Sequence, residues 1–167
     1  MARRAFYSFH YLPDGWRASQ VRNMGVVEGD RPVSDNDWEQ IVRGGDASIK
    51  QWINGQMSGK SCVVVLIGAN TAGRKWINYE IEYGWNAKKG VVGIYIHNLL
   101  DSAGKQSAKG ANPFASFTIG SGATARRMDS VVRAYDPPYS MSTSVYDYIK
   151  SNLAQWAEEA CDIRAAI

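Results

Sequence analysis

The sequence predicts a three-layer α/β domain, with a mostly parallel central sheet flanked by helices. Strand-like and helix-like segments alternate along the chain, and residues 61–67 are continuously apolar and β-branched. Such a run is typical of a central parallel strand covered on both faces. A chain of 167 residues suits one domain over 1–167, and a domain of this size buries roughly 70% of its unfolded surface. We therefore expect it to fold without disulfides or a structural metal.

The first segments are predicted to be a strand, a turn and a short helix. Aromatic residues dominate 4–11, which favours a strand, and the turn residues 13–15 follow it. A short helix is expected over 17–24. Residues 25–36 carry glycine, proline and aspartate and predict a loop, in which Val26 and Val27 indicate a short strand.

Two helical pieces are expected before the central strand. The first starts near Asp35 or Asn36, because either side chain can cap a helix. Gly44 and Gly45 interrupt it. The second piece, 46–57, carries apolar residues at helical spacing.

The second half of the chain is predicted to hold two strands, two helices and one long loop. The loop is rich in glycine, serine, alanine and lysine, and loops this long in a compact domain are usually functional or mobile. The expected order is helix 74–89 closed by Gly90, strand 91–96, loop 98–130, strand 131–135 and helix 143–160.

Composition argues against several classes of protein. The net charge of +3 is too mild for nucleic-acid binding. The longest aliphatic run, 63–67, is far shorter than the roughly 20 residues of a membrane span. With no export signal, Cys62 and Cys161 are expected to be reduced thiols in a cytoplasmic protein. His10 and His97 are the only histidines and cannot build a histidine-rich metal site, so no metal is expected.

The first strand carries polar residues where an α/β sheet opens to its ligand. Ligands bind such sheets at the carboxyl ends of the strands, where strand order reverses. Ser8 and His10 lie towards that end, although a hydrogen-bonded core serine and an exposed terminal histidine are an equally simple interpretation. Alternation divides the strand into two faces, one with Phe6, Ser8 and His10 and the other with Tyr7, Phe9 and Tyr11.

One helical carboxylate stands out. Trp76 and Glu80 share a stripe of the helix over 74–89, next to the apolar stripe of Ile77 and Ile81. Glu80 therefore lies at the flank of the helix, whereas Glu82 is expected to point into solvent. Periodicity alone favours a solvated position for Glu80 as well.

Together these segments resemble TIR domains, and most closely the TIR-like sensor proteins of the bacterial Thoeris anti-phage system. The spacing Trp76-x-x-x-Glu80 is similar to the TIR signature whose glutamate is catalytic in enzymatic members. The other matching segments are the opening strand 6–11, the central strand 63–68, the Trp-Ile-Asn-Gly stretch 52–55 and the Lys-Gly-Ala-Asn-Pro-Phe loop 109–114.

The resemblance implies a TIR-like, flavodoxin-like fold and an enzyme that cleaves the nicotinamide–ribose bond of NAD. Glu80 would be catalytic, with NAD as substrate and no separate cofactor. The ADP-ribose would be joined to itself, or in some branches to another acceptor, giving a diffusible nucleotide signal that activates a separate effector after a phage-derived trigger. Substrate contacts are expected from Phe6, Ser8, His10 and, in a loop that is either a lid or a bare surface segment, Asn112.

Two other functions stay open at this stage. The fold can serve as a non-enzymatic interaction module, because one fold hosts many functions. A nucleoside deoxyribosyltransferase-like enzyme also places a glutamate against a sugar beside a similar sheet. The sequence likewise leaves open whether the chain forms a homo-oligomer, and which linkage the product has.

Overall fold

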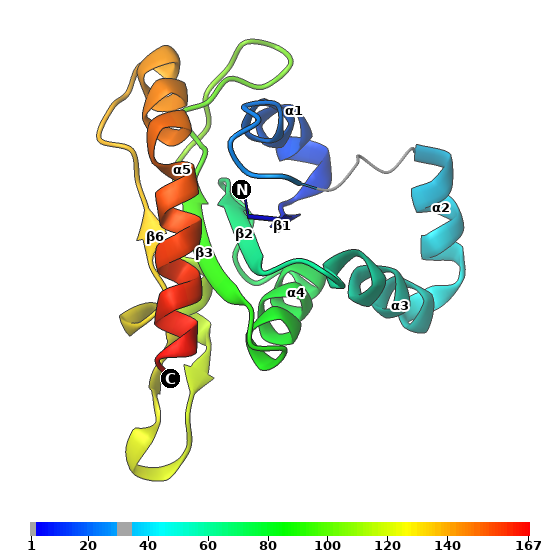
Figure 1. Cartoon of the computed structure of the whole chain (residues 1–167). Helices are drawn as coiled ribbons and strands as arrows, with labels where there is room; N and C mark the ends of the chain where they lie inside the picture. The colour runs from blue at the N-terminus through cyan, green and yellow to red at the C-terminus, as the bar shows by residue number, and fades with distance from the viewer. Residues whose placement is uncertain (1–2, 30–34) are drawn as a thin grey trace.

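The computed structural model describes residues 3–29 and 35–167, and it confirms the predicted α/β architecture (Figure 1). Four parallel strands form the central sheet in the order β1-β2-β3-β6. Their bounds are β1 (Ala5–Ser8), β2 (Cys62–Ile67), β3 (Gly90–Tyr95) and β6 (Ala134–Tyr135).

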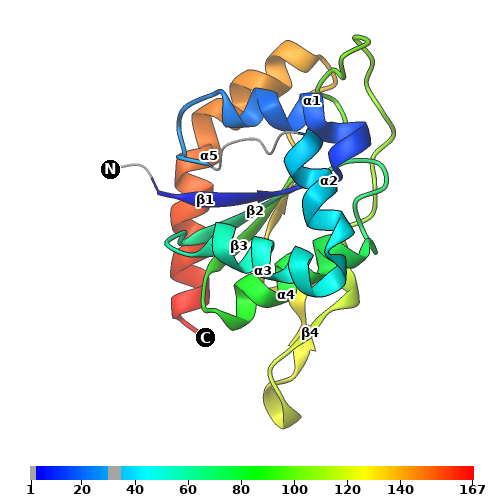
Figure 2. The same ribbon diagram turned by 90° about the vertical axis from the view of Figure 1, so that its right-hand side faces the viewer.

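Helices cover both faces of this sheet (Figures 1 and 2). Side chains of α1 and α5 share one core cluster with the sheet, and those of α3 and α4 share the other. The remaining helix, α2, contacts α3. The bounds are α1 (Tyr11–Arg22), α2 (Asp35–Arg43), α3 (Gly45–Met57), α4 (Lys75–Asn86) and α5 (Ser142–Ala165).

The order of chain connections reverses at β1. Beyond its outer edge, the backbone N–H of Ala5 donates to the carbonyl of Glu28, and the N–H of Glu28 donates to the carbonyl of Arg3. The chain therefore passes first to one side of β1 and later, through β2, to the other. Because ligands bind α/β sheets at such a reversal, the carboxyl ends of β1 and β2 mark the expected crevice.

The start of the chain differs from the prediction. The strand ends at Ser8 rather than residue 11, and α1 begins at Tyr11 rather than at 17. The helix accommodates Pro13 because this residue lies in the first helical turn, where a backbone N–H would have no intrahelical acceptor. The expected strand at Val26 and Val27 is reduced to the single bridge at Glu28. The predicted loop 25–36 lies partly outside the described residues.

The end of α4 was also predicted incorrectly. The helix stops at Asn86, and Lys88, not Gly90, takes the left-handed backbone conformation with φ of 63°. Gly90 instead opens β3. A Cβ atom there would lie 2.6 Å from the backbone nitrogen of Cys161, so the close approach of α5 to the sheet requires glycine.

The long segment 98–130 is partly ordered into short elements. A 3-10 turn, η1 (Pro113–Ser116), precedes an antiparallel hairpin of β4 (Thr118–Ile119) and β5 (Arg126–Arg127). Figure 2 shows this hairpin projecting from the body of the domain. The strand expected over 131–135 shortens to β6, and the last helix starts at Ser142, one residue before the predicted start, and continues to Ala165. Within the described residues, no helix combines the length and apolarity that crossing a membrane requires.

Candidate functional site

A cavity of about 690 Å³ opens at the carboxyl ends of β1 and β2. Its walls come from the β1–α1 junction, α3, the loop between β2 and α4, the first turns of α4, and Ala111. Ligand-binding pockets for small molecules typically have about 300–1,000 Å³. The cavity is thus large enough for a nucleotide, and it lies where the strand order reverses.

Glu80 lines this cavity, and Ser8 contacts it from behind, outside the set of residues that form the wall. The hydroxyl of Ser8 donates a hydrogen bond of 3.2 Å to the Glu80 carboxylate. Only 8% of Glu80 and none of Ser8 is exposed. Strand alternation turns Ser8 towards α4, and the buried stripe of Ile77 and Ile81 turns Glu80 towards the strand. The solvated alternative for Glu80 is therefore excluded, while Glu82 on the same helix is exposed as expected.

Phe6 and His10 line the same cavity. Phe6 is 3% exposed and packs in the core cluster beneath α3 and α4. His10 stands at the N-cap position of α1, and its Nδ1 is buried without a hydrogen-bond partner among the described residues. Burial lowers the pKa of His10, the nearby Arg74 charge lowers it further, and Asp14 partly opposes both. A neutral imidazole therefore faces the cavity at pH 7.

Asn112 was expected to contact substrate, but its side chain bonds to the backbone of its own loop. Its side-chain oxygen accepts a hydrogen bond of 2.9 Å from the backbone N–H of Phe114 and so caps η1. The cavity is lined from this segment by Ala111 instead. The structure places Phe6, His10 and Glu80 in the cavity wall, with Ser8 bonded to Glu80 behind it, and it does not place Asn112 there. Contact of these residues with substrate stays a prediction.

Sequence reasoning missed part of the cavity wall. Phe9 and Tyr11 also line it, because β1 ends at Ser8 and alternation no longer separates them from His10. Their rings stack at 6.2 Å, and the Arg22 guanidinium lies 5.3 Å from the Phe9 ring centre. The sequence did contain a signal for the early start of α1, because Pro13 followed by an acidic residue is typical of a first helical turn.

The cavity carries more positive than negative side chains. Arg22, Arg74 and Lys75 line it, and Glu80 is the sole carboxylate among its described lining residues. Across residues 3–29 and 35–167, no cluster of three or more His, Cys, Asp or Glu side chains is arranged to hold a metal ion. The chemistry at hand is that of one buried carboxylate, neutral polar groups and cations.

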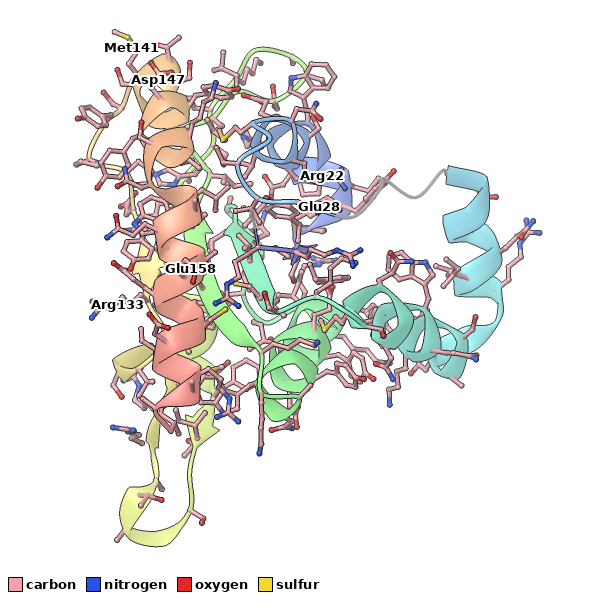
Figure 3. The ribbon with its side chains drawn as sticks, in the orientation of Figure 1. Arg22, Glu28, Arg133, Met141, Asp147 and Glu158 are labelled. Atoms are coloured by element: carbon pink, nitrogen blue, oxygen red, sulfur yellow. The ribbon has the colours of Figure 1, made fainter. Side chains whose placement is uncertain are left out.

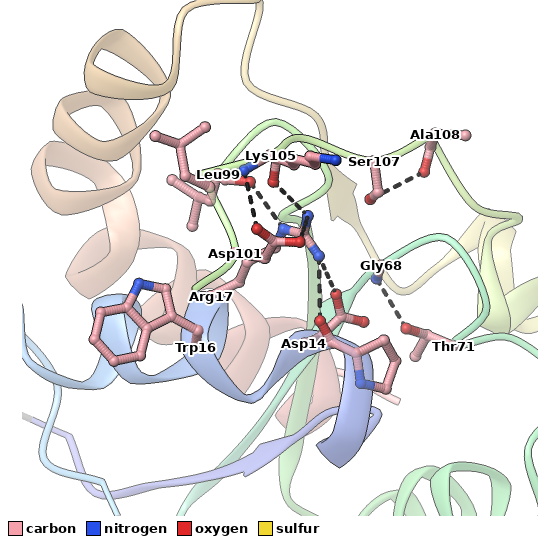
Figure 4. Close-up of polar contacts among 12 residues, drawn as sticks. Asp14, Trp16, Arg17, Gly68, Thr71, Leu99, Asp101, Lys105, Ser107 and Ala108 are labelled. Carbon is pink, nitrogen blue, oxygen red and sulfur yellow. Dashed lines mark hydrogen bonds and ion pairs between the residues drawn. The ribbon is translucent and has the colours of Figure 1, made fainter. Parts of the chain in front are cut away.

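A buried ion pair fixes the β1–α1 junction in place (Figure 4). The Arg17 guanidinium donates to Asp14 at 2.9 Å and to the carbonyl oxygens of Leu99 and Lys105, each at 2.8 Å. Asp14 in turn donates its backbone N–H to the carbonyl of His10 at 3.1 Å. This network ties the loop after β3 to the first turn of α1, and so holds His10 at the cavity.

Comparison with known proteins decides the family. Residues 6–101 match the family model of the Thoeris protein ThsB, TIR-like domain. The chain belongs to this ThsB family. The match includes Phe6, Ser8, His10 and Glu80 but ends before Asn112.

A relative of the chain bears the same family name. The chain is 34% identical over 119 residues to a protein of Bacillus cereus (strain MSX-D12) named "Putative cyclic ADP-D-ribose synthase ThsB1". The alignment covers 68% of this chain and 62% of the relative. The resemblance to Thoeris TIR-like proteins is thus confirmed as membership of the ThsB family.

Proposed function

We propose that this ThsB-family chain cleaves the nicotinamide–ribose bond of NAD and converts the ADP-ribose into a cyclic ADP-ribose type signal. The observation that carries the proposal is the buried carboxylate of Glu80, held by Ser8 in the wall of a nucleotide-sized cavity. The name of the B. cereus relative supports the same class of product.

One carboxylate is sufficient for the bond cleavage. Breaking an N-glycosidic bond builds positive charge on the ribose, and a carboxylate beside the ring stabilises that oxocarbenium-like transition state. Nicotinamide leaves as a neutral molecule, so no strong general acid is required. The hydrogen bond from Ser8 fixes the Glu80 carboxylate in one position, which makes its charge available without rearrangement during the reaction.

Ring closure requires that another atom of the same molecule reaches the ribose before water does. Phe6 supplies an apolar wall against which a ring can stack. His10, neutral at pH 7, supplies a polar contact that does not add positive charge next to the forming cation. An adenine nitrogen or a ribose hydroxyl then attacks the ribose carbon that nicotinamide has left, provided the cavity excludes water.

In this proposal the product acts away from the enzyme. It diffuses to a separate effector and activates it, after a phage-derived trigger has released the enzyme from a resting state. Such a resting state protects the cell, because constant hydrolysis of NAD would be harmful. The enzyme would act in the cytoplasm, where NAD is accessible.

The test compares two carboxylates on one helix. Glu80→Gln removes the buried charge, and Glu82→Gln removes an exposed charge two residues further along α4. Nicotinamide release from NAD and cyclic products are measured by mass spectrometry, in lysates of phage-infected cells and with purified protein. We expect E80Q to lose at least about a hundredfold in rate, as when one main electrostatic stabiliser is deleted, and E82Q to match the wild type.

Other outcomes would identify another function. Full product formation by E80Q would refute the mechanism. Signalling in cells that survives E80Q, while surface substitutions abolish it, would indicate an interaction module. Release of a free base from nucleosides, without release of nicotinamide from NAD, would indicate a deoxyribosyltransferase-like enzyme.

A further inference from the structure

The cations that line the cavity come from other positions in the fold than its carboxylate. Arg74 and Lys75 open α4 and Arg22 closes α1, whereas Glu80 lies in the second turn of α4 beside β1. A ligand that fits this distribution carries an uncharged or developing positive end at Glu80 and negative charge near the cations.

The three cationic side chains differ in whether another side chain of the protein already contacts them. Lys75 forms an ion pair with Asp46 and lies 5.0 Å from the ring centre of Trp76. Arg22 lies over the Phe9 ring at 5.3 Å. The Arg74 side chain forms no ion pair, hydrogen bond or ring contact with the residues that the structure describes, and it is exposed and lines the cavity.

Arg74 is also separated along α4 from Glu80, the residue proposed to act on the ribose. It precedes Glu80 by six residues, which corresponds to about 9 Å along a helix axis. The charge of Arg74 is felt at His10, which places the guanidinium on the β1 side of the cavity. Arg74 and Glu80 thus line one cavity at separate positions along α4, as a ligand with a phosphate beside a ribose requires.

We propose that Arg74 binds the diphosphate of the dinucleotide and makes the cavity selective for nucleotides over nucleosides. The identity of the full substrate rests on the proposed function, but the phosphate subsite follows from the cavity itself. A guanidinium suits this role because its planar donors engage two phosphate oxygens at once, which an ammonium does not do. Arg74 acts on binding and orientation, while Glu80 acts on the ribose.

The subsite is tested by equilibrium binding of ADP and adenosine, measured by calorimetry at low and at moderate salt. Arg74→Gln removes the cation, and Arg126→Gln removes an exposed arginine of β5 outside the cavity wall. We expect R74Q to weaken ADP binding about tenfold, as for loss of one charge-assisted contact. Adenosine binding should not change, and R126Q should bind both compounds like the wild type.

A conservative variant separates charge from geometry. Arg74→Lys keeps the positive charge but lacks the planar pair of guanidinium donors. It should therefore bind ADP more tightly than R74Q but less tightly than the wild type. Thermal unfolding of each variant checks that the fold is kept. The proposal is overturned if R74Q binds ADP like the wild type, if it loses ADP and adenosine equally, or if the wild type binds ADP no better than adenosine.

This result is independent of the catalytic test. E80Q should bind ADP at least as tightly as the wild type, because it removes a negative charge and because ADP lacks the ribose on which Glu80 is proposed to act. If E80Q still formed product, the proposed mechanism would fail while an Arg74-dependent preference for ADP would stand. If E80Q were inactive but R74Q bound ADP normally, only the phosphate subsite would be rejected.

Discussion

Replacing Arg17 by methionine tests whether the buried ion pair stabilises the domain. The side chains of Arg17 and Asp14 are 4% and 2% exposed, so neither charge can return to water when its partner is removed. Methionine keeps most of the volume but leaves the Asp14 carboxylate buried without its cation. Breaking such a pair costs about 3–5 kcal/mol, a large share of the roughly 5–15 kcal/mol by which domains are stable.

The pH dependence of this loss gives a second, sharper readout. Burial already raises the pKa of Asp14, and the hydrogen bond from Arg17 opposes that rise. Without Arg17 the pKa rises further, so folded R17M binds a proton that the unfolded chain releases above about pH 4. Stability contributed by that proton grows as pH falls towards the unfolded pKa and is lost as pH rises.

Urea unfolding at pH 7.5 and pH 5 measures both effects. The difference in unfolding free energy between wild type and R17M should shrink at pH 5. The double variant D14N/R17M should be more stable than R17M at pH 7.5, because it removes the stranded carboxylate. A loss below about 1 kcal/mol at pH 7.5, the range of an exposed ion pair, would contradict this reasoning, as would a loss independent of pH with no recovery in the double variant.

Two further predictions concern the contact between α5 and the sheet. Gly90→Ala should destabilise the protein by about 1–3 kcal/mol in urea unfolding, because a Cβ would meet the backbone nitrogen of Cys161 at 2.6 Å; Gly55→Ala, in open space on α3, should be neutral or stabilising. The Cys161 thiol should be alkylated by iodoacetamide before the buried Cys62, because a hydrogen bond from Cys62 and the charge of Arg3 lower the pKa of Cys161. Peptide mass spectrometry across pH should show the alkylation midpoint of Cys161 moving upward in C62A, and an unchanged midpoint would show that Cys62 has no such effect.

The sequence predicted the parts of the fold whose patterns are long and unambiguous. The apolar run of β2 and the helical spacing of α3, α4 and α5 are each dictated by burial on a known face, so their positions were confirmed. The β1–α1 boundary was wrong because aromatic residues favour strands, yet Phe9 and Tyr11 are aromatic in order to line a cavity and not to extend β1.

The site required information that no local pattern contains. Ser8 and Glu80 are 72 positions apart, so only the fold shows that one satisfies the hydrogen bonding of the other. Periodicity alone put Glu80 in solvent, and only the family resemblance suggested otherwise. Asn112 precedes a proline and caps a short turn, a role for which asparagine is well suited. Arg74 had no distinguishing signal, because an exposed arginine before a helix is common.

The last helix has a consequence for how the chain acquires its structure during synthesis. One face of the sheet is covered by α5 together with α1. Glu158, labelled on α5 in Figure 3, pairs with Arg3 beside the first strand. Until α5 has left the ribosome, the apolar side chains of β2 and β3 on that face lack the cover that α5 provides and have only α1. The nascent domain therefore cannot complete its core before almost all of it has been translated, and a chaperone that shields aliphatic strands has the longest opportunity to act on it.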